Sequence, residues 1–106
     1  MKLKKIDDVI GEAYIFWCPG CHMSHTVPVA YKEGFAEHRG KKKPVWRFNG
    51  DEGYPTFSPE IRTSWMYGTK HTDVQHCHVI IRDGELIYLV GSTHELSGKR
   101  FPMRHI

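Results

Sequence analysis

Short hydrophobic runs separated by turn residues dominate the chain and predict β-strands. Segments 13–17 (AYIFW), 25–31 (HTVPVAY), 44–48 (PVWRF) and 61–67 (IRTSWMY) are aromatic and β-branched, or alternate hydrophobic and polar positions. The strongest signal is a hairpin in which CHVII (77–81) and LIYLV (86–90) flank the turn RDGE. Asp83 and Gly84 supply the positive φ angles that a two-residue turn requires.

Turn-forming and charged residues fill the intervals between these runs. The segment 32–43 (KEGFAEHRGKKK) predicts an exposed loop or a strained hairpin connection, and 49–60 (NGDEGYPTFSPE) is too rich in glycine and proline for a central strand. Only 92–99 (STHELSGK) predicts a helical turn. We therefore expect a mainly β, single-domain sandwich, roll or partly open barrel with at most one short helix. Residues 1–12 form a lead-in, 13–102 the core and 103–106 a tail.

Composition narrows the class of protein. The chain has 106 residues, of which 40% are hydrophobic and 25% charged, which is typical of one soluble domain. No apolar run approaches the roughly 20 residues that span a bilayer, and no signal peptide is recognisable, so a cytoplasmic protein is expected. The net charge is +3, and basic residues are scattered except in GKKKP (40–44), so nucleic-acid binding is not favoured. The oligomeric state stays open.

The three cysteines indicate a metal site. Cys18 and Cys21 form a Cys-Pro-Gly-Cys turn within FWCPGCHMSH (16–25), where both thiolates can point to one centre, and Cys77 is the remaining thiol. We favour His25 as the fourth ligand and His94 as the second choice. Three further histidines are nearby candidates: His22, His76 and His78. Neighbouring side chains on a strand face opposite ways, so Cys77 and the residue after it should not share one metal. Structural zinc is favoured over a catalytic metal because the ligand set is rich in cysteine. It is favoured over a redox pair because the thiols lie in a mainly β context, without a helix N-terminus to lower the pKa of the first thiol.

Candidate catalytic groups are sparse. Ser58 lies between two prolines that restrict its position, and His78 or His94 could act as its base. The alternative for Ser58 is a turn residue that bonds its own backbone. Thr56 and Ser64 are less constrained. Three other histidines in polar or terminal surroundings are expected in solvent: His38, His71 and His105.

The blocks FWCPGCHMSH, PVWRFNGDEGYPTFSPEI and CHVIIRDGELIYLVGSTHELSGK, which lie in order between residues 14 and 102, resemble a known family. It consists of small phage and bacterial domains often labelled as ammonia monooxygenase, and it includes the BubE-type peptidases of bacterial ubiquitination-like operons. The resemblance implies a serine-type peptidase that acts on a ubiquitin-like protein. It also implies that seven residues belong to the family pattern: Cys18, Cys21, His25, Ser58, Cys77, His78 and His94.

The chain departs from that pattern in two places. Glu60 stands where the family usually has a second serine, and Gly91 or Ser92 stands where an acidic residue is usual. If the second serine is the family's nucleophile, this chain is inactive or uses another residue. Three hypotheses follow: a zinc-stabilised serine peptidase, a non-catalytic phage or accessory protein that binds a partner through exposed aromatics, and a weak nucleic-acid binder. The candidate aromatics are Trp46, Trp65 and Tyr67, and the favoured alternative for each is an ordinary core residue of a small β fold.

Overall fold

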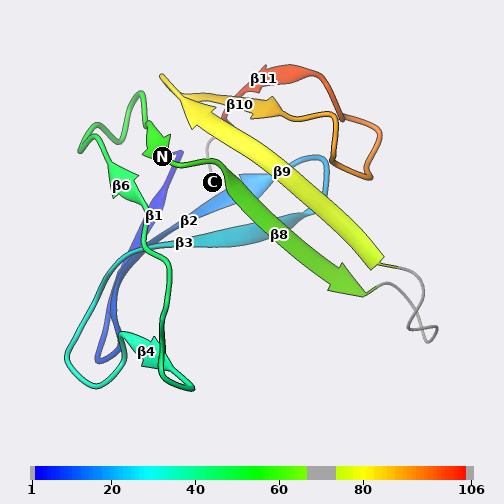
Figure 1. Ribbon diagram of the computed structural model, residues 1–106. Coiled ribbons are helices and arrows are strands. Elements are labelled where there is room, and N and C mark those ends of the chain that lie inside the picture. Colours follow the sequence, from blue (N-terminus) through cyan, green and yellow to red (C-terminus); the bar gives the residue numbers. More distant parts are fainter. Residues whose placement is uncertain (1, 67–73, 105–106) are drawn as a thin grey trace.

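The protein is an antiparallel β structure (Figure 1), and its computed structural model describes residues 2–66 and 74–104. These residues contain eleven strands and no helix. The strands are β1 (Lys4–Asp7), β2 (Gly11–Cys18), β3 (Met23–Tyr31), β4 (Glu37–His38), β5 (Lys41–Lys42), β6 (Arg47–Phe48), β7 (Phe57–Ser58), β8 (Ile61–Met66), β9 (Val74–Arg82), β10 (Glu85–Tyr88) and β11 (Arg100–Pro102). The predicted mainly β class is confirmed.

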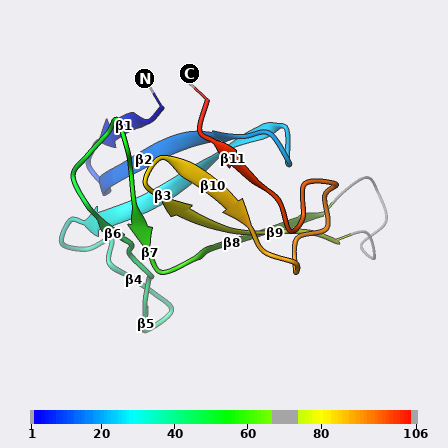
Figure 2. The same cartoon turned by 90° about the horizontal axis from the view of Figure 1, so that it is seen from above.

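Two larger sheets form the body of the molecule. One has the order β1-β2-β3 and the other the order β11-β10-β9-β8, while β4-β5 and β6-β7 are two small ribbons. The views in Figures 1 and 2 show β2 and β3 in one layer and β8 and β9 in another. Each large sheet has one face toward the other sheet and one toward solvent, which is the sandwich arrangement.

The core consists of alternate residues from both sheets. β2 contributes Tyr14, Phe16 and Cys18, and β10 contributes Leu86 and Tyr88, all of them buried. A bulge between residues 12 and 13 interrupts the pairing of β2 with β3, and from there to its end β2 alternates regularly between the core and the outer face. Further buried side chains come from the other strands and from both ends of the chain: Leu3, Val27, Phe57, Ile61, Cys77, Val79, Ile81 and Met103.

The β9–β10 hairpin is confirmed as the sequence predicts. Arg82 pairs with Glu85, and the two residues between them have φ angles of 49° (Asp83) and 77° (Gly84). The left-handed conformation at both positions matches the twist of the flanking strands, so the turn fixes the register of β9 against β10. That register places Cys77 on the inner face of the sheet.

Several local expectations need correction. The strand predicted over 44–48 is reduced to β6. Trp46 packs against the core, which is the favoured alternative for this residue, and its indole N–H donates to the Glu60 carbonyl at 3.2 Å. The segment 92–99 forms turns instead of a helical turn. The lead-in supplies β1, which pairs with β2, and the buried Leu3. Tyr67 lies outside the described residues.

Candidate active site and metal centre

The Cys-Pro-Gly-Cys turn closes the β2–β3 hairpin. β2 ends at Cys18, which pairs with Met23, so residues 19–22 form a four-residue connection. Gly20 is required there, because the His94 ring lies against it and a Cβ at this position would be 2.4 Å from the ring. β3 runs antiparallel to β2 away from this turn, so His25, near the start of β3, lies close to the thiols.

Four potential metal ligands meet between the two sheets. One ligand atom from each of Cys18, Cys21, His25 and Cys77 lies within 4.8 Å of all the others. The Cys18 and Cys77 sulfurs are 3.9 Å apart, too far for a disulfide and close to the ~3.8 Å that two sulfurs of a tetrahedral zinc site show with Zn–S bonds of about 2.3 Å. The donor set of three thiols and one imidazole is typical of a closed structural zinc site, so the residues fit that metal.

The three thiols lie close enough to alter one another's pKa. Hydrogen bonds from Cys21 and Cys77 lower the pKa of Cys18. The same contact with Cys18 raises the pKa of Cys21 to about 12, and it also raises the pKa of Cys77. Three thiolates at these distances would repel one another, and a bound cation removes that repulsion.

Tyr88 and His94 pack beside the cluster without joining it. The Tyr88 hydroxyl lies 3.1 Å from the Cys18 sulfur, and burial raises the pKa of this phenol. The His94 ring packs edge to face on Tyr88 with ring centroids 4.6 Å apart. Burial lowers the pKa of His94, so the ring favours its neutral form. These two side chains support the ligands in the way that outer residues orient a metal shell.

The strand β9 presents different chemistry on its two faces. Cys77 and Val79 are fully buried, whereas His76 and His78 are only partly covered and point to the outer face. His76 pairs across the sheet with Ser64 on β8, and Ser64 Oγ lies 2.9 Å from His76 Nδ1. This hydroxyl–imidazole contact has the reach that a general base needs toward a nucleophile.

His78 has a different set of neighbours. Its ring lies against Gly91, where a Cβ would be 2.7 Å from His78 Nδ1. Its cross-strand partner is Arg62, whose guanidinium pairs with the Glu60 carboxylate. Glu60 immediately precedes β8, two residues before Arg62, so alternation places its side chain on the same face as Arg62, diagonal to His78, and the ion pair occupies this place.

Ser58 is exposed at the end of β7, where it pairs with Arg47. The Ser58–Pro59 peptide bond is cis. Within the described residues, no hydrogen bond joins the Ser58 hydroxyl to an imidazole. Ser58, His78 and His94, the catalytic residues expected from sequence, thus lie on three different segments, and the structure shows a hydrogen-bonded serine–histidine pair elsewhere.

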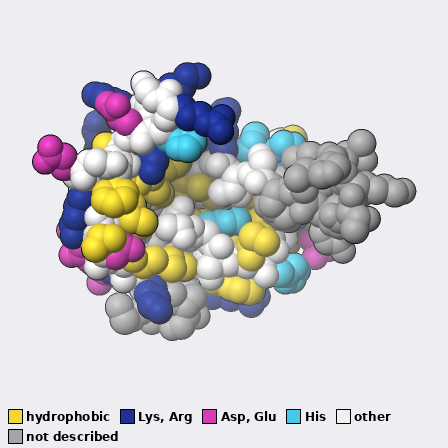
Figure 3. All heavy atoms as spheres, turned by 90° about the horizontal axis from the view of Figure 1, so that it is seen from below, with side chains coloured by type: hydrophobic (Ala, Val, Ile, Leu, Met, Phe, Trp, Pro, Cys, Tyr) yellow, Lys and Arg dark blue, Asp and Glu magenta, His cyan; other side chains and the backbone are white. Residues whose placement is uncertain are grey.

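Sequence reasoning missed the Ser64–His76 pair and Tyr88. Ser64 and His76 are twelve residues apart, and only the register of β8 on β9 brings them together. Strand alternation was the available signal. Ser64 lies two residues from Arg62 and His76 lies two residues from His78, so each pair shares one face of its strand. Figure 3 shows several histidine side chains on one face of the molecule. Of the histidines expected in solvent, His38 is exposed on β4, and the other two lie outside the described residues.

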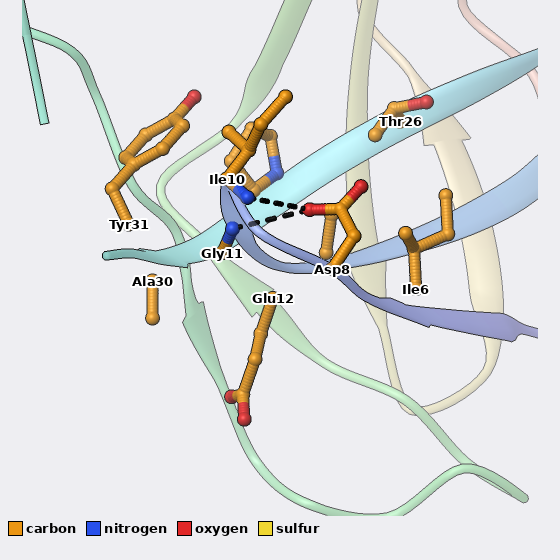
Figure 4. A pocket seen from close by; sticks show the side chains of 10 residues that line it. Ile6, Asp8, Ile10, Gly11, Glu12, Thr26, Ala30 and Tyr31 are labelled. Atoms are coloured by element: carbon orange, nitrogen blue, oxygen red, sulfur yellow. Dashed lines mark hydrogen bonds between the residues drawn. The ribbon is translucent and has the colours of Figure 1, made fainter. Parts of the chain in front are cut away.

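Two pockets of the described surface, neither of them lined by Ser64 or His76, lie on other parts of the molecule. One of about 190 Å³ sits beside the β1–β2 turn (Figure 4), where the Asp8 carboxylate accepts hydrogen bonds from the backbone of Ile10 and Gly11. A larger one of about 490 Å³ lies beside the turn at 19–22, between His22, Leu96 and Phe101. The Asp8 carboxylate in the first pocket already accepts hydrogen bonds within the β1–β2 turn, so it is a poor candidate for a reactive group.

Comparison with models of known protein families gives a match. A family model described as "Bacterial ubiquitination-like system serine protease (BubE)" matches residues 3–89, which is most of the chain. Neither the curated proteins nor the solved structures contain a match. The described residues form no helix of the length and hydrophobicity needed to cross a membrane.

Proposed function

The chain belongs to the BubE family of bacterial ubiquitination-like system serine proteases, and on that premise we propose that it is a serine-type peptidase. Its substrate in this proposal is the C-terminal tail of a ubiquitin-like protein in the cytoplasm. A zinc ion held by Cys18, Cys21, His25 and Cys77 stabilises the fold and takes no part in the cleavage.

The hydrogen bond between Ser64 Oγ and His76 Nδ1 carries this proposal. Ser64 Oγ attacks the carbonyl carbon of the scissile bond as its proton passes to the neutral imidazole, and the same proton then leaves with the departing amine. Water hydrolyses the resulting ester and restores the serine. The imidazole is held in position because the main chain of His76 bonds to Thr93 on the side away from β8.

Ser58 with His78 or His94 is the alternative nucleophile and base, and it rests on the family pattern in the sequence. A fluorophosphonate probe, which reacts with activated serines, separates the two assignments. We expect the wild type to be labelled, Ser58→Ala to be labelled equally and Ser64→Ala to lose labelling. The reverse result would move the nucleophile to Ser58. Zinc content and thermal melting of each variant check that the fold is intact.

A second candidate function is a non-catalytic module that binds the same ubiquitin-like protein. The Glu60–Arg62 ion pair favours it, because this pair occupies the place of the family's second serine beside His78. In that case the wild type stays unlabelled by the probe, and Glu60→Ser gains labelling. Glu60→Gln, which removes the charge without adding a hydroxyl, is the matched control and should stay unlabelled.

A further inference from the structure

We infer that the free edge of β8 binds an extended peptide, the tail of the partner protein, as an added β-strand. This rests on the proposed function, since it describes how the substrate of that site is held. β8 is the last strand of its sheet, and Ser64 lies in its middle. An unpaired strand edge offers a row of backbone donors and acceptors that an extended chain can use.

The hydrogen bonds of β9 fix which main-chain groups of β8 face outward. The N–H groups of His76 and His78 donate to the hydroxyls of Thr93 and Ser92, each at 2.9 Å. The carbonyls of the same two histidines accept from the N–H groups of Thr93 and Leu89. Their backbones therefore point away from β8.

Alternation then assigns the rest of the ladder. Because the even residues of β9 point away, Cys77 and Val79 must make the hydrogen bonds to β8. Arg62 and Ser64 lie opposite the two histidines in non-hydrogen-bonded pairs, so their N–H and C=O groups point to the free edge. Such pairs also bring side chains closest together, which agrees with the contact between Ser64 and its histidine.

The edge already accepts one hydrogen bond. The carbonyl of Glu60, two residues before Arg62, receives the indole N–H of Trp46 at 3.2 Å. Backbone groups further along β8, at Arg62 and Ser64, have no such partner among the described residues. An added peptide would begin beyond Trp46 and run past the Ser64 hydroxyl.

The two larger sheets have four edges, and the three edges other than β8 carry residues that discourage strand addition. β1 has Lys4 and Lys5, β3 has Pro28, and β11 has Pro102. Lysine and proline on an edge hinder pairing with another chain. The carbonyl of Pro28 is also occupied by the backbone N–H of Trp46 at 2.8 Å. β8 contains neither lysine nor proline, so among the four edges it is the one suited to a peptide.

A peptide whose backbone can be blocked on one side tests this inference. The probe is a fluorescent hexapeptide of alternating valine and threonine, with two analogues that carry N-methyl groups on one or the other set of alternate amides. Fluorescence anisotropy should show that one methylated set weakens binding at least tenfold while the other set binds like the parent. Absence of saturable binding, or equal binding by both analogues, would overturn the inference.

Variants of Arg62 give a second, independent measurement. Arg62→Pro removes an N–H that faces the free edge without removing a hydrogen bond to β9, and Arg62→Ala is its control because it loses the same ion pair but keeps the N–H. We expect peptide binding to fall at least tenfold in the proline variant alone. A dimer of the chain that disappears in that variant, with no peptide bound, would assign the edge to a second copy. Fluorophosphonate labelling does not require a peptide on the β8 edge. A wild type that is not labelled would therefore count against the proposed peptidase activity and leave the measurement of peptide binding unaffected.

Discussion

The two faces of β9 differ in burial although their residues are neighbours in sequence. On the inner face, Cys77 is fully buried and its sulfur meets that of Cys18 between the sheets. On the outer face, His76 is accessible and bonds the exposed Ser64. A closed set of three thiols and one imidazole leaves no open coordination position on a metal, whereas the Ser64 side chain on the outer face is exposed to solvent.

The difference in burial suggests that one face of β9 serves the stability of the fold and the other serves the proposed reaction. A chain of about one hundred residues builds only a modest core, so the metal that we propose at this cluster would join β2, the β2–β3 turn, β3 and β9 and contribute much of the folding free energy. In the proposed function the side chains of the outer face serve the substrate, and since they are more exposed we expect them to contribute less to that free energy. Changes on the inner face should therefore alter folding, and changes on the outer face should alter activity.

Removal of a metal ligand should have the largest effect. In Cys77→Ser the closed ligand set is lost, and because a structural zinc site contributes on the order of 10 kcal/mol, we expect a loss of at least about 3 kcal/mol in stability. The melting temperature should fall by at least about 12 °C, with less than one zinc per chain by elemental analysis. If Cys77→Ser keeps both its zinc and its melting temperature, the cluster is not a structural site.

The neighbouring residue on the outer face should behave in the opposite way. His76→Ala removes the base from Ser64, and we expect at least a ~10³-fold loss in the rate of tail cleavage, with a stability change below about 1 kcal/mol. The His78→Ala variant is the control for loss of an imidazole on the same face. Equal rates for His76→Ala and the wild type would exclude the Ser64 pair as the catalytic group.

The sequence was sufficient to predict the inner face but not the outer one. The spacing of Cys18 and Cys21 predicts a pair of metal ligands, and the turn at 83–84 determines the face on which Cys77 lies. The spacing and the turn are both local signals in the sequence. The Ser64–His76 contact depends on a register between strands whose connection carries no comparable turn signal. A hydroxyl and an imidazole twelve residues apart have no spacing motif, so only the assembled sheet shows that they meet.

The turns over 92–99 illustrate the same limit. Their composition predicts a helical turn, yet the hydroxyls of Ser92 and Thr93 bond the main chain of β9 and hold this segment against the sheet. Trp46 is a related case. A hydrophobic pattern does not indicate whether an aromatic side chain packs on the core or faces a partner, and in the structure Trp46 packs on the core. In each case long-range contacts override local preference.

A change at Tyr88 should have an intermediate effect, because its hydroxyl contacts the proposed metal ligand Cys18 but is not itself a ligand. Tyr88→Phe keeps the ring against His94 but loses the contact of 3.1 Å with the Cys18 sulfur. We expect a loss of about 1 kcal/mol in stability and about tenfold in zinc affinity, measured by competition with a chelating dye. Unchanged zinc affinity would show that the hydroxyl plays no part in holding the thiolate.

The smallest effect is expected at the Glu85–Arg100 ion pair, which joins β10 and β11 on the solvent side at 2.8 Å. The guanidinium lowers the pKa of Glu85 below its ordinary value of 4.5, so the folded state binds its proton less readily than the unfolded state. The contribution to stability is therefore full above pH 4.5 and disappears as the pH falls through the lowered pKa. Glu85→Gln removes this contribution, and because both side chains are exposed, its melting temperature should differ slightly from that of the wild type at pH 7 and converge with it in acid. A difference as large as that of Cys77→Ser would show that the solvent side also carries the fold, which would contradict the division between the two faces.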